Sequence, residues 1–167
     1  VVAITGTNGK STLTEFLCFA FNLQGGKAFA VGNNGYPMSR LFNQNSENAV
    51  AFCEVSSFQS QRLSHFRPDA LLWTNFTEDH LDIHANMRNY FAAKWNLVKR
   101  LRGNCCIIGD SVGIAAKNYG FKLPEFVQFV STGNSQREKW KVPFDSCFAS
   151  FPQRENLRLA QCYWNSE

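Results

Sequence analysis

The sequence has no long apolar run, no C-x₂-C pair of cysteines and no dense cluster of basic residues. No apolar stretch reaches the ~20 residues that cross a bilayer as a helix, so we expect no membrane association. The six cysteines lack metal-ligand spacing, and we expect free thiols in a reducing cytosol. The net charge of +4 is too mild for a nucleic-acid-binding protein but suits an anionic nucleotide substrate.

The composition is that of an ordinary globular chain, with 44% hydrophobic and 18% charged residues. Repeats and low-complexity segments are absent, and 167 residues correspond to about one domain. Val1 is not a methionine and begins inside an apolar, strand-like run. We therefore expect the sequence to be part of a longer protein.

A glycine-rich segment, residues 5–12 (TGTNGKST), follows this apolar run and precedes a helical pattern. Such a turn directs backbone N–H groups at one point, which suits a polyphosphate. Lys10 can reach the phosphates, and the hydroxyl of Ser11 or Thr12 can ligate Mg²⁺. The spacing departs from the usual phosphate-loop motif, since Ile4 stands where the first glycine is expected; an ordinary glycine turn is the alternative. We predict an ATP site formed by Thr7, Asn8, Gly9, Lys10, Ser11 and Thr12.

Strand-like and helix-like segments alternate along the chain. Short apolar runs without alternation, separated by helices, favour an α/β fold. We predict a mostly parallel sheet with helices on both faces, of the phosphate-loop NTPase type. Residues 145–152 fit either a turn or an added edge strand. The predicted strands are 1–4, 28–31, 49–53, 70–73, 105–108 and 126–130, and the predicted helices are 11–23, 57–63, 86–101, 111–118 and 154–163.

Polar segments follow the first four predicted strands, and in a parallel sheet they meet at one edge, where ligands bind. Glu54 ends the third strand, beside the predicted ATP site. A carboxylate there suits Mg²⁺, although it could also cap a helix or lie on the surface. His80 and His84 are four residues apart, but no third soft ligand for zinc is evident. We interpret His80 as a site residue and His84 as an ordinary structural histidine.

Lys94 lies in the middle of the apolar stripe of the helix predicted at 86–101. At 100° per residue, its side chain shares a face with apolar residues, whereas Trp95 and the charged residues point elsewhere. An unpaired ammonium there is strongly disfavoured. Lys94 could extend outward to solvent, pair with Glu78 or Asp79, or carry CO₂ as a carbamate, an anion that can bind a metal.

Taken together, four segments resemble the central ATPase domain of the Mur ligases, which build the stem peptide of peptidoglycan. These are residues 6–12 (GTNGKST), 54–57 (EVSS), 75–82 (NFTEDHLD) and 90–94 (YFAAK). The resemblance runs from Val1 to about Leu101. Residues 32–37 and 56–59 are most similar to ligases that add D-glutamate to UDP-N-acetylmuramoyl-L-alanine, whereas residues 80–94 are equally similar to ligases of the MurE type.

The resemblance implies roles for individual residues. Lys10 would hold the phosphates of ATP. The first Mg²⁺ would be bound by Ser11 and Glu54, and the second by His80 and a carbamylated Lys94. The substrate residues implied are Asn33, Ser56 and His80.

The implied reaction forms an amide in two steps. The substrate carboxylate attacks the γ-phosphate of ATP to give an acyl phosphate, and D-glutamate then displaces phosphate. Two divalent ions would neutralise the anions that meet. The resemblance also implies a monomer in the bacterial cytoplasm.

Two departures limit what the resemblance implies. The family motif His-Asn-x-x-Asn is matched only at Asn156, which is the predicted nucleotide contact. The family's N-terminal UDP-binding and C-terminal amino-acid-binding domains are absent from residues 1–167, so we expect this chain to bind Mg·ATP without forming an amide. The alternatives are folylpolyglutamate synthetase and, in another class, a nucleotide-dependent switch module.

Overall fold

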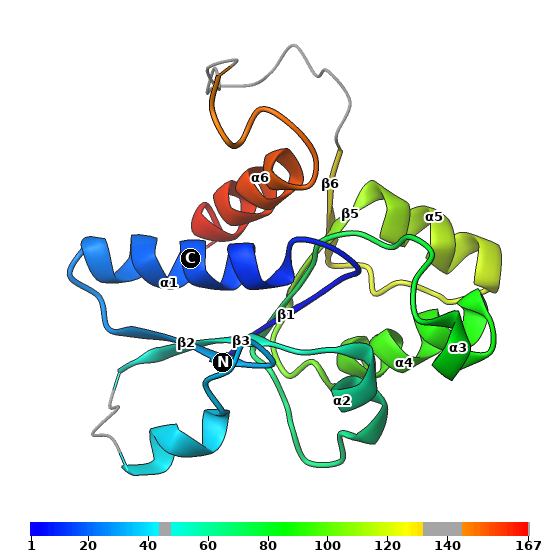
Figure 1. Cartoon of the computed structure of the whole chain (residues 1–167), viewed down its shortest axis with the longest axis horizontal. Coiled ribbons are helices and arrows are strands. Elements are labelled where there is room, and N and C mark those ends of the chain that lie inside the picture. Colours follow the sequence, from blue (N-terminus) through cyan, green and yellow to red (C-terminus); the bar gives the residue numbers. More distant parts are fainter. Residues whose placement is uncertain (44–47, 132–144, 167) are drawn as a thin grey trace.

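The computed structural model describes residues 1–43, 48–131 and 145–166. These residues form one sheet of six parallel strands in the order β2-β3-β1-β4-β5-β6 (Figure 1). The α/β architecture with a parallel sheet is therefore confirmed. The strands are β1 (Val2–Thr5), β2 (Ala28–Gly32), β3 (Val50–Glu54), β4 (Ala70–Trp73), β5 (Cys105–Gly109) and β6 (Val127–Val130).

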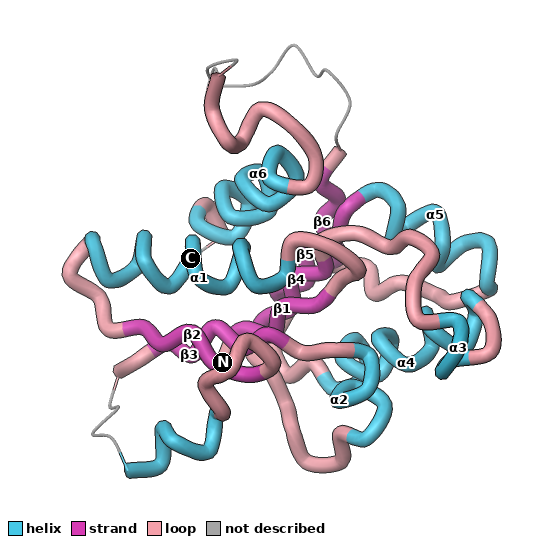
Figure 2. Tube along the Cα trace, in the orientation of Figure 1, coloured by secondary structure: helices cyan, strands magenta, loops and turns pink. Residues whose placement is uncertain are grey.

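Helices cover both faces of the sheet, which explains why its strands are continuous apolar runs. One face packs against α1 and α6, and the other packs against α2, α4 and α5 (Figure 2). The helices are α1 (Lys10–Leu23), α2 (Ser57–Arg62), α3 (Leu81–His84), α4 (Met87–Arg100), α5 (Asp110–Tyr119) and α6 (Gln153–Trp164), with a 3₁₀ helix η1 at Met38–Asn43.

Strand β1 lies between β3 and β4, and all four of its residues are buried. The glycine-rich segment leaves the carboxyl end of β1 and enters α1 directly. It is therefore flanked by the segments that follow β3 and β4. This is the place in a parallel sheet where ligands bind.

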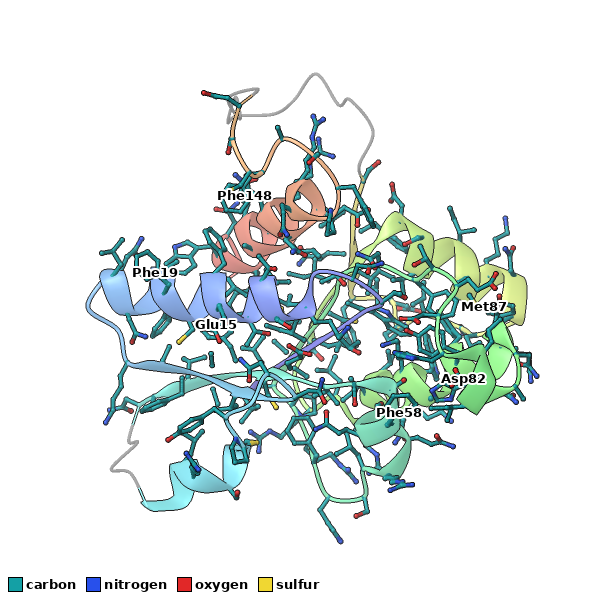
Figure 3. The ribbon with its side chains drawn as sticks, viewed as in Figure 1. Glu15, Phe19, Phe58, Asp82, Met87 and Phe148 are labelled. Atoms are coloured by element: carbon teal, nitrogen blue, oxygen red, sulfur yellow. The ribbon has the colours of Figure 1, made fainter. Side chains whose placement is uncertain are left out.

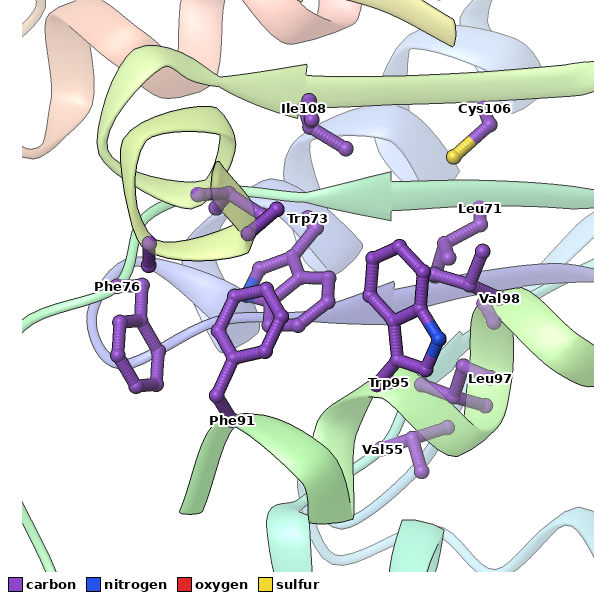
Figure 4. Close-up of a cluster of buried hydrophobic side chains, with 14 of the residues drawn as sticks. Val55, Leu71, Trp73, Phe76, Phe91, Trp95, Leu97, Val98, Cys106 and Ile108 are labelled. Atoms are coloured by element: carbon purple, nitrogen blue, oxygen red, sulfur yellow. The ribbon is translucent and has the colours of Figure 1, made fainter. Parts of the chain in front are cut away.

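An aromatic cluster fills the space between the sheet and α4 (Figure 4). The rings of Trp73 and Phe91 stack with centroids 4.8 Å apart. Trp95 lies outside the apolar stripe that contains Lys94, yet it is only 6% exposed and packs on Phe121 at 5.1 Å. Phe121, from the segment after α5, covers this flank of α4.

Two short elements were not predicted, η1 and the four-residue α3. The undecided segment 145–152 forms turns and bends rather than a strand. Among the described residues, no helix is both long and apolar enough to span a membrane.

Candidate active site

The backbone of the glycine-rich loop is held from outside by the residues that follow β4. The amide N–H of Asn8 donates to Asn75 Oδ1 at 2.9 Å, and Thr74 Oγ1 donates to the Asn8 carbonyl at 2.7 Å. Gly9 has φ 81°, a left-handed conformation that glycine adopts without strain. Among the residues that the structure describes, no side chain caps the N-terminus of α1. Its first N–H groups thus lack helical partners and suit an anion.

The N-terminus of α6 packs against the same loop. Asn156 Nδ2 donates to the Gly9 carbonyl at 3.0 Å, and Glu155 Oε2 accepts from Asn75 Nδ2 at 3.3 Å. Burial, with a smaller contribution from Asp110, raises the pKa of Glu155. Asn156 is 1% exposed, and its Oδ1 has no partner among the described residues. This oxygen is available to an N–H donor such as a nucleotide base.

Five of the twelve predicted site residues line one pocket of about 210 Å³. Lys10 lies at its edge and donates from Nζ to the Thr7 carbonyl at 2.8 Å. The structure thus brings together residues that come from the ends of four strands and from α4. The pocket is lined by Lys10, Asn33, Ser56, Ser57, Phe58, His80, Tyr90 and Lys94.

Glu54 lies beside this pocket and is 3% exposed. Its Oε1 accepts from Asn33 Nδ2 at 3.2 Å, which joins two predicted site residues. Its Oε2 is buried and has no partner among the described residues. A buried carboxylate oxygen without a hydrogen-bond donor fits a hard divalent cation.

Lys94 is 1% exposed, and its ammonium forms no ion pair with an acidic side chain of the described residues. Its Nζ donates to the Gly6 carbonyl at 2.8 Å and to Thr5 Oγ1 at 3.4 Å, so the predicted alternatives of exposure or pairing with Glu78 or Asp79 were wrong. Burial, assisted by the charge of Lys10, lowers the pKa of Lys94 to about 7. An appreciable fraction of this amine is therefore uncharged at neutral pH and able to react with CO₂.

His80, directly before α3, and His84, at its end, face different partners. His80 is exposed at the pocket, and its Nε2 lies 3.4 Å from Asp79 Oδ2. His84 is buried, with Nε2 3.0 Å from Ser57 Oγ. Burial is the main cause that lowers the pKa of His84. Within the described residues, no group of three His, Cys, Asp or Glu side chains is placed to hold a metal by itself.

Ser56 has a local structural task as well as a place at the pocket. Its hydroxyl accepts from the Gln59 N–H at 3.2 Å, and Gln59 Oε1 accepts from the Ser56 N–H, so the pair forms a capping box for α2.

Several pocket residues were missed in the sequence. Tyr90 was identified only as an apolar position, although its hydroxyl lies 3.3 Å from Thr7 Oγ1. The polar pair at 56–57 follows the buried strand β3 after one residue, and this position was the signal that could have identified Ser57.

A family model described as the Mur ligase middle domain matches residues 4–148. The chain is 42% identical over 123 residues to a UDP-N-acetylmuramoylalanine–D-glutamate ligase of Lawsonia intracellularis, covering 73% of this chain and 28% of that protein. A ligase of the same name from Chloroherpeton thalassium is 42% identical over 102 residues, covering 58% and 22%. The chain thus spans less than a third of the length of these curated relatives.

Among solved structures, the fold resembles that of MurF ligase from Thermotoga maritima in complex with ADP. The TM-score is 0.65 at 14% identity, and the match covers 99% of this chain and 44% of the other. At that identity the likeness concerns the fold alone.

Proposed function

The chain belongs to the Mur ligase family, and from this membership we propose that it is the ATP-binding part of a ligase that joins D-glutamate to UDP-N-acetylmuramoyl-L-alanine. The observation that carries the proposal is the single pocket lined by Lys10, His80 and Lys94, with the unpartnered oxygen of Glu54 beside it. A nucleotide-dependent switch needs a phosphate loop but has no use for a buried amine in the same pocket.

In this proposal the glycine-rich loop binds the triphosphate of ATP. Lys10 exchanges its contact with the Thr7 carbonyl for the phosphates, and the uncapped N-terminus of α1 adds N–H donors. Asn156 contacts the base through its free Oδ1. These groups orient the γ-phosphate toward the substrate carboxylate, and positioning supplies much of the rate enhancement in phosphoryl transfer.

The residues around the pocket fit two magnesium ions. Glu54 and Ser11 would hold one, and His80 with a carbamate on Lys94 would hold the other. When bound, these ions neutralise the charge of the phosphates and of the attacking carboxylate. Two observations support the carbamate, namely the burial of Lys94 and its pKa of about 7.

The substrate would approach over the segments that follow β2 and β3. Asn33, Ser56 and His80 come from three different loops and all line the pocket. We assign to them the contacts with the muramoyl-alanine end of the substrate. The proposed compartment is the bacterial cytoplasm, because ATP and a UDP-linked precursor are the proposed substrates, and the proposed working unit is a monomer.

Because the chain spans 28% of the Lawsonia intracellularis ligase, we propose that it is part of a longer polypeptide, and the experiment compares the two. Each is incubated with Mg·ATP, D-glutamate and UDP-N-acetylmuramoyl-L-alanine, and the amide product is followed by mass spectrometry. We expect the longer polypeptide to form the product and its Lys10→Ala variant to form none. Calorimetry should show that the chain alone binds Mg·ADP. Absence of product from the longer polypeptide, or amide formation by the chain alone, would contradict the proposal.

A further inference from the structure

One buried histidine outside the pocket touches three of the residues that line it. Besides its hydrogen bond to Ser57, the ring of His84 stacks on Phe58 with centroids 5.3 Å apart and planes 5° apart. On another side it contacts Tyr90 at 5.2 Å. His84 is therefore held by one hydrogen bond and two ring contacts, all to residues of the pocket wall.

The backbone around His84 is held in an uncommon conformation. Helix α3 is bracketed by His80 at φ 53° and Ala85 at φ 64°, both in the left-handed region that residues other than glycine seldom adopt. Such conformations persist where the surroundings impose them. Ile83 is 60% exposed, and a hollow of about 510 Å³ lies between α2, α3 and α4. The inward contacts of His84 are thus a principal anchor of this short helix.

The ring of Phe58 connects His84 to the pocket. It lies 5.1 Å from the His80 ring and 5.3 Å from the His84 ring, so one aromatic side chain touches both histidines. Figure 3 shows Phe58 on α2 beside the segment that carries Asp82 on α3. We propose that His84 is a positioning residue, which sets the place of the His80 imidazole at the pocket through its contacts with Ser57 and Phe58. The inference rests on the proposed function only where it concerns metal binding by His80.

The experiment uses the three histidines of the chain, His65, His80 and His84, as ring-labelled NMR probes. His84→Phe keeps a flat ring between Phe58 and Tyr90 but loses the hydrogen bond to Ser57. Ser57→Ala loses the same bond from its other end with a smaller change in volume, and it serves if the first variant fails to fold. His65→Phe is the matched control because His65 is exposed and outside the site.

The first measurement needs no metal. The ring signal of His80, identified by its loss in His80→Gln, is shifted by the nearby ring of Phe58. We expect this signal to move in both His84→Phe and Ser57→Ala and to stay in place in His65→Phe. An unmoved His80 signal in both site variants would overturn the inference.

The second measurement adds Mn²⁺ with ADP, since Mn²⁺ broadens the signals of nuclei near it. Partners that orient a metal ligand are worth about 10- to 100-fold in metal affinity, so both variants should need about tenfold more Mn²⁺ to broaden His80. The double variant His84→Phe/Ser57→Ala should need no more Mn²⁺ than either single variant, because both substitutions remove the same hydrogen bond. If the His80 signal of the wild type broadens and the variants need no more Mn²⁺ than the wild type, the positioning role is refuted. A wild-type His80 that is not broadened would instead refute the proposed metal site, and the metal-free shifts would then decide the inference.

Discussion

Replacing Lys94 by methionine should make the protein more stable and remove one component of its pH dependence. Burial lowers the pKa of Lys94 from its ordinary value of 10.5 to about 7. A tenfold change in a protonation equilibrium is worth about 1.4 kcal/mol, so below pH 7 the buried ammonium costs about 5 kcal/mol of folding free energy. Methionine has a similar length and carries no charge. Against this gain, the Gly6 carbonyl loses its donor, a loss of about 1–3 kcal/mol.

The net expectation for Lys94→Met is a gain of about 2–4 kcal/mol at pH 6.5. The sign of the pH dependence follows from proton counts. Between pH 7 and 10.5 the unfolded chain keeps the Lys94 proton and the folded chain has released it, so wild-type stability rises with pH. From pH 6.5 to 8.5 the rise due to Lys94 amounts to about 2 kcal/mol, and the variant should lack it.

Urea unfolding of both proteins in buffer freed of CO₂ measures the difference directly. Taking the difference between wild type and variant at each pH cancels the groups that they share, such as the cysteines. A difference that stays constant from pH 6.5 to 8.5 would refute the assignment of a strongly lowered pKa to Lys94. A less stable variant at pH 6.5 would show that the Gly6 hydrogen bond outweighs the desolvation of the charge.

Four further substitutions test other parts of the site by calorimetry with Mg·ADP and by urea unfolding. Lys10→Ala should weaken Mg·ADP binding roughly a hundredfold with the fold intact, since hydrogen bonds to charged groups are worth about 1.5–3 kcal/mol. Unchanged binding would contradict the assignment of phosphate binding to the glycine-rich loop. In Gly9→Ala the new Cβ would lie 2.6 Å from Asn156 Nδ2 at φ 81°. We expect weaker binding and about 1–3 kcal/mol of destabilisation, and Asn156→Ala should restore part of the lost stability. Ser56→Ala should lose about 1 kcal/mol of stability, as a helix cap does, and keep its Mg·ADP affinity. Gln59→Ala should behave likewise, and a fall in nucleotide affinity in either would contradict the local role of the capping box.

The elements that could be predicted from the sequence are those with an apolar run or a long helical period. All six strands and five helices were placed within about two residues, because both faces of the sheet are covered and each run ends at turn-forming residues. Helix α3 has four residues, too few to show a period. The burial of Trp95 depends on Phe121, which is distant in sequence and contributes no local pattern.

The residues of the candidate site also divide into those that a local sequence pattern reveals and those that depend on distant residues. Glu54 and Lys94 could be identified because a charged side chain at the end of a buried strand, or inside an apolar stripe, is itself a local anomaly. Asn75 and Glu155 could not, because their importance lies in a contact between segments 80 residues apart. His84 was set aside as structural, since its sequence neighbours do not reveal that Ser57 faces it across the pocket wall.

The two lysines of the pocket explain each other's chemistry. Lys10 is partly exposed at the edge of the pocket, whereas Lys94 is buried behind the loop. The positive charge of Lys10 helps lower the pKa of Lys94, and so it favours the uncharged amine that CO₂ requires. Once a carbamate forms, the charge at position 94 is negative, and the same neighbour becomes attractive. If Lys94 carries the proposed carbamate, the charge of Lys10 therefore disfavours the ammonium, favours the reactive amine and stabilises the product. On this argument, removing the charge of Lys10 should reduce carbamylation of Lys94 as well as nucleotide binding, and ¹³C NMR of the chain with ¹³CO₂ would reveal whether it does.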